Sequence, residues 1–285
     1  MPQYLLAMAI FGTIGLFVKF ITLPSALIAL CRGIIGTLFL LGVLTLLGRR
    51  LNTRAIATNA KHLFIAGAAL GLNWIFLFEA YRATSVAAAT LAYYMAPVIV
   101  ILLSPFILKE KASAAKLLCA AAALLGMSLI AGVWEGSLAA SGLRGIGMGL
   151  AAACFYAAII FNNKFLKGLD PYDSAIVQLG VSALVLLPYV AATTDFGALS
   201  LDWQTAALTA AVGIIHTGAA YWLYFSALPK LEAARIAIFS YVDPAIAILL
   251  SVFVLAEPMS AAGVAGAVLI LGAAIASEFV GKPKA

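Results

Sequence analysis

Charged side chains are scarce in this chain. Only 10% of its 285 residues are Asp, Glu, Lys or Arg, whereas 65% are hydrophobic. Soluble domains carry about 25% charged and about 45–50% apolar residues. A compact soluble fold cannot bury so much apolar surface, because a large part of any folded surface faces the solvent. The composition therefore argues against a soluble protein and favours an integral membrane protein surrounded by lipid.

Cysteines and catalytic motifs are also few. The three cysteines, Cys31, Cys119 and Cys154, lie inside apolar runs without the spacing of a disulfide framework or a metal site. No HExxH, GxSxG or GxxxxGKS/T motif occurs, and only one aspartate lies deep in an apolar run. We therefore predict no enzyme, no catalytic residue, no cofactor and no metal site. We also predict no nucleic-acid binding, because the basic residues behind the net charge of +6 border apolar segments.

Long apolar runs fill nearly the whole chain. Each is close to the roughly 20 residues that cross a bilayer as a helix. Lipid offers no partner to open backbone groups, so helices are the expected spanning form. We predict an all-α integral membrane protein with ten transmembrane helices, at about 3–21, 25–47, 62–82, 84–106, 114–132, 145–166, 173–193, 203–227, 233–255 and 261–280.

The basic residues predict the orientation. With the N-terminus inside, Lys19, Arg82 and Arg144 lie outside and Arg32 falls within the second helix. All other basic residues then fall on the cytoplasmic side: Arg49, Arg50, Arg54, Lys61, Lys109, Lys111, Lys116, Lys164, Lys167, Lys230, Arg235, Lys282 and Lys284. No basic residue precedes the first run, so we expect a retained helix instead of a signal peptide. Both termini are predicted to be cytoplasmic.

A repeat is hidden in the chain at an offset of 147 residues. Matching pairs include Pro24 with Pro171, Gly71 with Gly218, Phe78 with Phe225, Tyr94 with Tyr241, Pro97 with Pro244, Ser104 with Ser251 and Glu110 with Glu257. We place the two halves at residues 1–134 and 145–285. Five helices in each half give the halves opposite orientations, and such inverted repeats are typical of transporters that work by alternating access. Some channels share this architecture, so a channel stays an alternative.

Several motifs carry a family resemblance over nearly the whole chain. They are residues 29–32, 78–81, 95–97, 109–111, 221–228, 241–244 and 255–258. The chain resembles the drug/metabolite transporter superfamily, in its ten-helix form with two EamA-type halves. Within it, the chain is most similar to YddG-type exporters of aromatic and neutral amino acids. The resemblance implies a multi-pass protein of a plasma membrane, expected to be a bacterial inner membrane. It also implies small-molecule cargo, with drugs or nucleotide sugars as alternatives to amino acids.

Polar and aromatic residues within the spans form the predicted substrate site, near the midplane between helices one, three, four, six, eight and nine. The candidates are Asn73, Trp74, Phe78, Tyr81, Tyr94, Tyr156, Asn163, His216, Tyr221, Trp222, Tyr224, Tyr241 and Asp243. An aromatic stripe at helical spacing also fits packing or an interfacial belt. A histidine titrates near neutral pH, so His216 is either a proton-coupling residue or a hydrogen-bonded packing residue.

Three further features have open readings. Pro97 and Pro244 each remove one helical hydrogen bond and are predicted to act as gating hinges or fixed kinks. Arg32 and Glu79 are predicted to form an ion pair ahead of any substrate contact. Glu257, like Glu110, is expected to cap the helix that follows it. The sequence predicts a secondary transporter that exports small neutral or aromatic amino acids, and it leaves open a monomer or a homodimer.

Overall fold

The computed structural model describes residues 1–109, 113–130, 140–199, 201–227, 230–231 and 239–279, and no strand occurs within these ranges. The first half contains α1 (Pro2–Lys19), α2 (Ser25–Leu46), α3 (Thr53–Thr58), α4 (Ala60–Ala83), α5 (Val86–Tyr93), α6 (Ala96–Ile107) and α7 (Ala114–Ile130). The second half contains α8 (Ala140–Lys164), α9 (Pro171–Thr193), α10 (Trp203–Ala211), the π-helix η1 (Val212–Ala219), α11 (Ala220–Ala227), α13 (Val242–Phe253) and α14 (Ala261–Phe279).

These elements form an all-α membrane protein with ten spans. Seven are long and apolar enough to cross a bilayer, counting α5 with α6, and α10 with η1 and α11, as single spans. Three shorter apolar helices, within α7, α13 and α14, complete the set. The predicted runs agree with the helix bounds to within five residues, except that the start of the run at 233–255 lies outside the described residues. The short helix α3 was not predicted.

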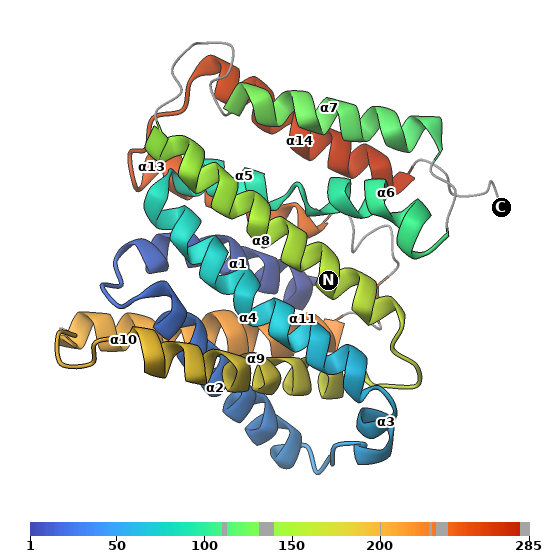
Figure 1. Ribbon diagram of the computed structural model, residues 1–285, viewed down its shortest axis with the longest axis vertical. Coiled ribbons are helices and arrows are strands. Elements are labelled where there is room, and N and C mark those ends of the chain that lie inside the picture. Colours follow the sequence, from blue (N-terminus) through green and yellow to red (C-terminus); the bar gives the residue numbers. More distant parts are fainter. Residues whose placement is uncertain (110–112, 131–139, 200, 228–229, 232–238, 280–285) are drawn as a thin grey trace.

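The helices of the two halves pack in equivalent ways. Two contacts join equivalent helices of the two halves, α2 with α9 and α7 with α14, and a third, α5 with α13, joins the fourth span to the ninth, its equivalent. Other contacts occur twice, since α4 packs on α8 as α11 packs on α1, and α4 packs on α9 as η1 packs on α2. Figure 1 shows α7 and α14 side by side at one end of the molecule, with α2 and α9 toward the other.

Two glycines show the repeat at the level of single residues. A methyl group on Gly71 would lie 3.0 Å from Leu186, and one on Gly218 would lie 2.5 Å from Phe39. Gly71 and Gly218 are 147 positions apart, and so are their neighbours Phe39 and Leu186. The same close helix contact is therefore built twice, which small residues permit in membranes. This agrees with the predicted inverted repeat.

Polar contacts gather at two opposite ends of the bundle. At one end Lys19 pairs with Glu257, and at the other Arg49 pairs with Asp170. Each pair joins connections that the predicted alternation places on one side of the membrane. We call these the Lys19 end and the Arg49 end. The assignment of the Arg49 end to the cytoplasm stays a prediction.

The crossing of α7 and α14 gives a first test of the packing. A methyl group on Gly126 would lie 2.7 Å from the carbonyl oxygen of Gly266. We expect Gly126→Ala to lower the free energy of unfolding by about 1–3 kcal/mol, the usual cost of overpacking. Thermal unfolding of the detergent-solubilised protein measures this. Gly272→Ala is the matched control, because a methyl group there has no neighbour within 4 Å. Equal unfolding temperatures for the two variants would contradict the close crossing.

Candidate functional site

Two interrupted helices meet near the middle of the bundle. In the first half, α5 ends at Tyr93 and α6 begins at Ala96, with Pro97 in its first turn. In the second half Tyr241 interrupts the helical path just before α13, with Pro244 in the first turn. Proline has no amide hydrogen, so each one ends the hydrogen-bond ladder from the preceding turn. Both prolines therefore start a new helix, instead of bending a continuous one as predicted.

Tyr94 joins the two interruptions. Its hydroxyl donates to Oδ2 of Asp243 at 3.0 Å and lies 3.5 Å from the carbonyl oxygen of Ser240. Its ring centre is 6.2 Å from that of Tyr241, its equivalent in the other half. In a continuous helix the carbonyl of Ser240 would accept from the amide of residue 244. Pro244 has no amide hydrogen, so this carbonyl lacks its helical donor. The two halves thus make polar contact at the point where both helices are broken.

Aromatic residues surround this contact. The ring of Tyr93 lies against Tyr94 and is 5.3 Å from that of Tyr156 on α8. On the other side, Tyr221 and Tyr224 of α11 lie against Phe11 of α1. Of the tyrosines predicted as site residues, Tyr94 lies in the break itself, Tyr156 lies on α8, which contacts α5, and Tyr221 and Tyr224 lie on α11, which contacts α1.

Tyr156 is an accessible member of this aromatic group. It is 38% exposed, and its ring lies against Tyr93 of α5. We take Asp243, Tyr156 and the other tyrosines of this group as the candidate site.

A second polar cluster lies beside the tyrosines. Arg32 on α2 is only 4% exposed. Its Nε donates to the hydroxyl of Thr217 at 2.9 Å, and its guanidinium lies over the rings of Trp74 and Phe78 at 3.9 and 5.5 Å. The predicted ion pair with Glu79 is wrong. Thr217 and the aromatic rings take the place of the carboxylate, and Glu79 interacts electrostatically with Arg82.

The π-helix η1 shapes this cluster. In a π-helix the backbone hydrogen bonds join residues five positions apart, instead of four as in an α-helix, and such turns often mark functional sites. Thr217 donates to the carbonyl of Val212, five residues before it. His216 is 1% exposed and shares a 2.8 Å hydrogen bond with Thr13 of α1. This geometry agrees with a hydrogen-bonded packing role for His216, and a proton-coupling role stays a prediction.

Other predicted site residues have partners that hold helices together. Asn73 donates to the carbonyl of Ala152, which links α4 to α8. Asn163 accepts from Gln178, which links α8 to α9. Trp222 is half-buried against the core, and Tyr81 is buried against Gly15 and Phe78. These four stay candidates, and none of them takes part in the hydrogen bond between Tyr94 and Asp243.

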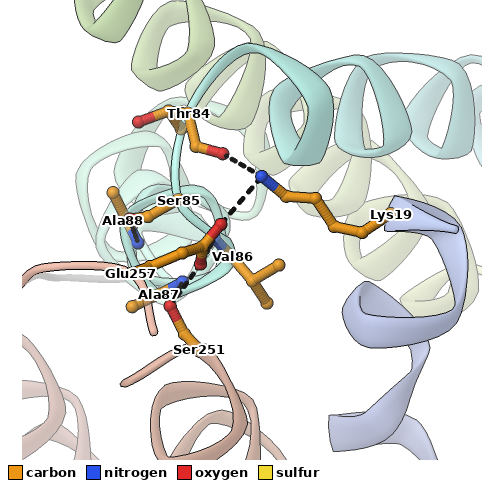
Figure 2. A network of polar contacts seen from close by, with 8 residues as sticks. All are labelled: Lys19, Thr84, Ser85, Val86, Ala87, Ala88, Ser251 and Glu257. Carbon is orange, nitrogen blue, oxygen red and sulfur yellow. Dashed lines mark hydrogen bonds and ion pairs between the residues drawn. The ribbon is translucent and has the colours of Figure 1, made fainter. Parts of the chain in front are cut away.

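Glu257 joins the two halves at the Lys19 end of the bundle, as Figure 2 shows. Its carboxylate accepts from the amide of Val86 at 2.8 Å and pairs with Lys19 at 2.8 Å. Ser251 donates to the same carboxylate and accepts from the amide of Ala87. The first amides of α5 are thus capped by α13 and the residues that follow it. Negative charge is favourable at a helix N-terminus, where amides lack helical partners.

The predicted cap was therefore assigned to the wrong helix. Glu257 caps α5 of the other half, whereas Ser260 accepts from the amide of Gly263 and caps α14. Sequence reasoning missed Lys19 and Ser251 as partners. The repeat did single out Ser251 and Glu257 as conserved between the halves, and that was the available signal. The equivalent Glu110 lies outside the described residues.

Comparison with known proteins identifies the family. The model of the EamA-like transporter family matches residues 3–132 and 143–277. The chain belongs to this family. It is 33% identical over 251 residues to the uncharacterized transporter YxxF of Bacillus subtilis, covering 87% of this chain and 79% of that protein. It is 28% identical over 264 residues to an uncharacterized transporter of Archaeoglobus fulgidus, covering 92% and 90%.

A solved crystal structure has the same fold. It superposes with a TM-score of 0.66 at 20% identity, covering 97% of this chain and 96% of the other. At this identity the likeness concerns the fold alone. Together the comparisons make the chain an EamA-family membrane protein whose relatives are named as transporters.

The Lys19–Glu257 pair gives a second test. The two side chains are 25% and 16% exposed, so solvent weakens their attraction and we expect a coupling free energy of about 1 kcal/mol. Lys19→Met, Glu257→Gln and the double variant form a double-mutant cycle in thermal unfolding. Glu79→Gln with Lys19→Met is the control cycle, since no ion pair joins those residues in the described structure. Additive effects in the first cycle would contradict the closed geometry.

Proposed function

We propose that this EamA-family protein exports small neutral and aromatic amino acids, or closely related metabolites, by alternating access. The contact between Tyr94 and Asp243 across the two helix junctions is the observation that supports this most directly. It combines a carboxylate, a hydroxyl and aromatic rings. Those groups suit a ligand with an ammonium group and an apolar or aromatic side chain.

The carboxylate of Asp243 is the feature that favours a cationic group. A charged side chain within a span is costly and usually faces a partner or a polar cavity. The partner here is a neutral hydroxyl, and neither ion pair of the described structure includes Asp243. An ammonium group beside Asp243 supplies the missing positive charge. The nearby rings of Tyr94 and Tyr241 offer faces for an apolar side chain.

Alternating access requires two bodies that move against each other. We assign these bodies to residues 1–134 and 145–285, with Pro97 and Pro244 as hinges where each central span is already broken. The Lys19 end is held shut by contacts between the bodies, with Lys19 and the α5 amides on one and Glu257 and Ser251 on the other (Figure 2). Release of these contacts is then the opening step at that end.

Transport of amino acids is tested by counterflow in proteoliposomes. We expect labelled L-phenylalanine to accumulate in vesicles preloaded with unlabelled L-phenylalanine, with saturation at high concentration. Asp243→Asn and Tyr94→Phe should each lower the rate at least about tenfold, the scale expected for a lost hydrogen bond to a charged group. Tyr189→Phe is the matched control, because Tyr189 is 51% exposed on α9. Flux that never saturates would favour a channel, and no counterflow with any amino acid would contradict the proposed cargo.

The hinge role of the junction prolines is tested in the same assay. Pro97→Ala and Pro244→Ala restore an amide donor, and a more continuous helix should resist motion at the junction. We expect slower turnover in both variants with little change in the substrate concentration at half-saturation. Pro188→Ala is the control, since Pro188 lies inside α9, away from the junctions. Unchanged turnover in both junction variants would contradict the hinge role and leave the prolines as static helix breaks.

A further inference from the structure

The guanidinium of Arg32 is an incompletely satisfied charge. Nε has a partner in Thr217, and no acceptor within the described residues bonds to either terminal nitrogen. The buried side-chain atoms left without partners in those residues are the hydroxyls of Ser25 and Thr90. The terminal nitrogens of Arg32 are not among them, so they retain some accessible surface. A side chain that is 96% enclosed therefore keeps unused donors that are not fully buried.

Within the described residues, no carboxylate forms an ion pair with this guanidinium. The two ion pairs found among the described residues are Lys19 with Glu257 and Arg49 with Asp170. Arg32 instead has the ring of Trp74 on its face and the hydroxyl of Thr217 at its edge. A cation–π contact offsets part of the cost of burying a guanidinium but leaves its in-plane donors unused. Those donors form a planar fork that matches a carboxylate.

The internal repeat shows that the fold does not require this cluster. The polar residues Thr13, Arg32, His216 and Thr217 contact one another or lie side by side. The positions 147 residues away are apolar without exception: Ile160, Leu179, Ala69 and Leu70. Leu179 is fully buried at the place equivalent to Arg32. The same helix crossing is therefore packed with apolar side chains in one copy and with a buried cation in the other, so the cation has a purpose other than packing.

The cluster also lies next to the proposed amino-acid site. Both contact α1: Thr13 shares a hydrogen bond with His216 of the cluster, and a methyl group on Gly12 would lie 2.5 Å from the carbonyl oxygen of Asp243. The Arg32 cluster and Asp243 thus lie beside the same stretch of α1, and neither ion pair of the described residues joins the two charges. Opposite charges held apart near aromatic rings match the two ends of a zwitterion.

We propose that Arg32 binds the carboxylate of the transported substrate, through the two terminal nitrogens that Thr217 leaves unused. This inference rests on the proposed function and narrows its substrate class to compounds with a carboxylate. In a zwitterionic amino acid the ammonium group would face Asp243 and the side chain would lie among the tyrosines. Trp74 and Thr217 position the guanidinium, and the substrate completes its set of hydrogen bonds.

The test is ligand-induced thermal stabilisation of the full-length purified protein. Three probes separate the charges: L-phenylalanine has both, 3-phenylpropionate has only the carboxylate, and phenethylamine has only the ammonium group. In Arg32→Gln we expect apparent affinity for the two carboxylate probes to fall about 10- to 100-fold, the scale of a lost charge-assisted hydrogen-bond pair. The affinity of Arg32→Gln for phenethylamine should stay within about twofold of the wild-type value, because phenethylamine has no carboxylate that Arg32 could bind.

Two further variants keep the test decisive. Arg32→Lys keeps the charge but not the planar fork, so it should fold and show an intermediate loss. Arg82→Gln is the matched control, because Arg82 donates to the backbone carbonyls of Ile21 and Leu23 at the Lys19 end. It should leave the ranking of the three probes unchanged.

Several results would overturn the proposal. They are equal affinity of Arg32→Gln and the wild type for the carboxylate probes, no carboxylate binding by the wild type, and equal loss in Arg82→Gln. Failure of the proposed function is a separate result. If carboxylate probes bind and depend on Arg32 but no amino acid shows counterflow, the Arg32 site stands and the proposed transport is wrong.

Discussion

The structure depends on one constraint, the need to satisfy backbone polar groups away from water. Lipid accepts no open amide or carbonyl, so a broken helix at membrane depth must be covered by protein. Here both breaks lie where α5 contacts α13. The Tyr94 hydroxyl lies within reach of the Ser240 carbonyl and donates to Asp243. Each break is thus sheltered by the other, and the region that the fold must cover most carefully is also the region with polar groups for a ligand.

Symmetry builds this scaffold, and departures from symmetry give it chemistry. Packing contacts are repeated at equivalent positions, as Gly71 with Leu186 and Gly218 with Phe39 demonstrate. The charges of the candidate site and of the Arg32 cluster are not repeated, because Asp243 corresponds to Ala96 and Arg32 to Leu179. Alternation between two mirrored conformations needs the shared packing, whereas a single ligand with distinct ends needs unlike groups around it. Both the shared packing and the unlike groups are obtained when apolar positions match between the halves and the charged positions of the site do not.

Sequence reasoning found the helices and the repeat because both depend on patterns along the chain. Apolar runs gave the spans, and matching prolines marked the positions Pro97 and Pro244, although as bends and not as the breaks that the structure has. It failed where the partner is set by three-dimensional packing. Arg32 was paired with Glu79 by depth alone, but the π-helix η1 brings Thr217 to its edge. Glu257 was assigned to the next helix, but its partners are in α1 and α5. The separate supporting roles of Asn73 and Asn163 were hidden for the same reason.

The closed Lys19 end and the central junction are connected through α5. Glu257 caps this helix at Val86, and Tyr94 follows its last residue only about 12 Å away along the axis. A helix of eight residues that is fixed by hydrogen bonds at both ends moves as one body. Loss of the cap at Val86 frees one end of α5 and thereby weakens the positioning of Tyr94 against Asp243. A ligand that replaces the Tyr94–Asp243 contact frees the other end. In the proposed function, α5 with its two anchors would link opening to binding, as the kind of two-state element that coupling between distant sites requires.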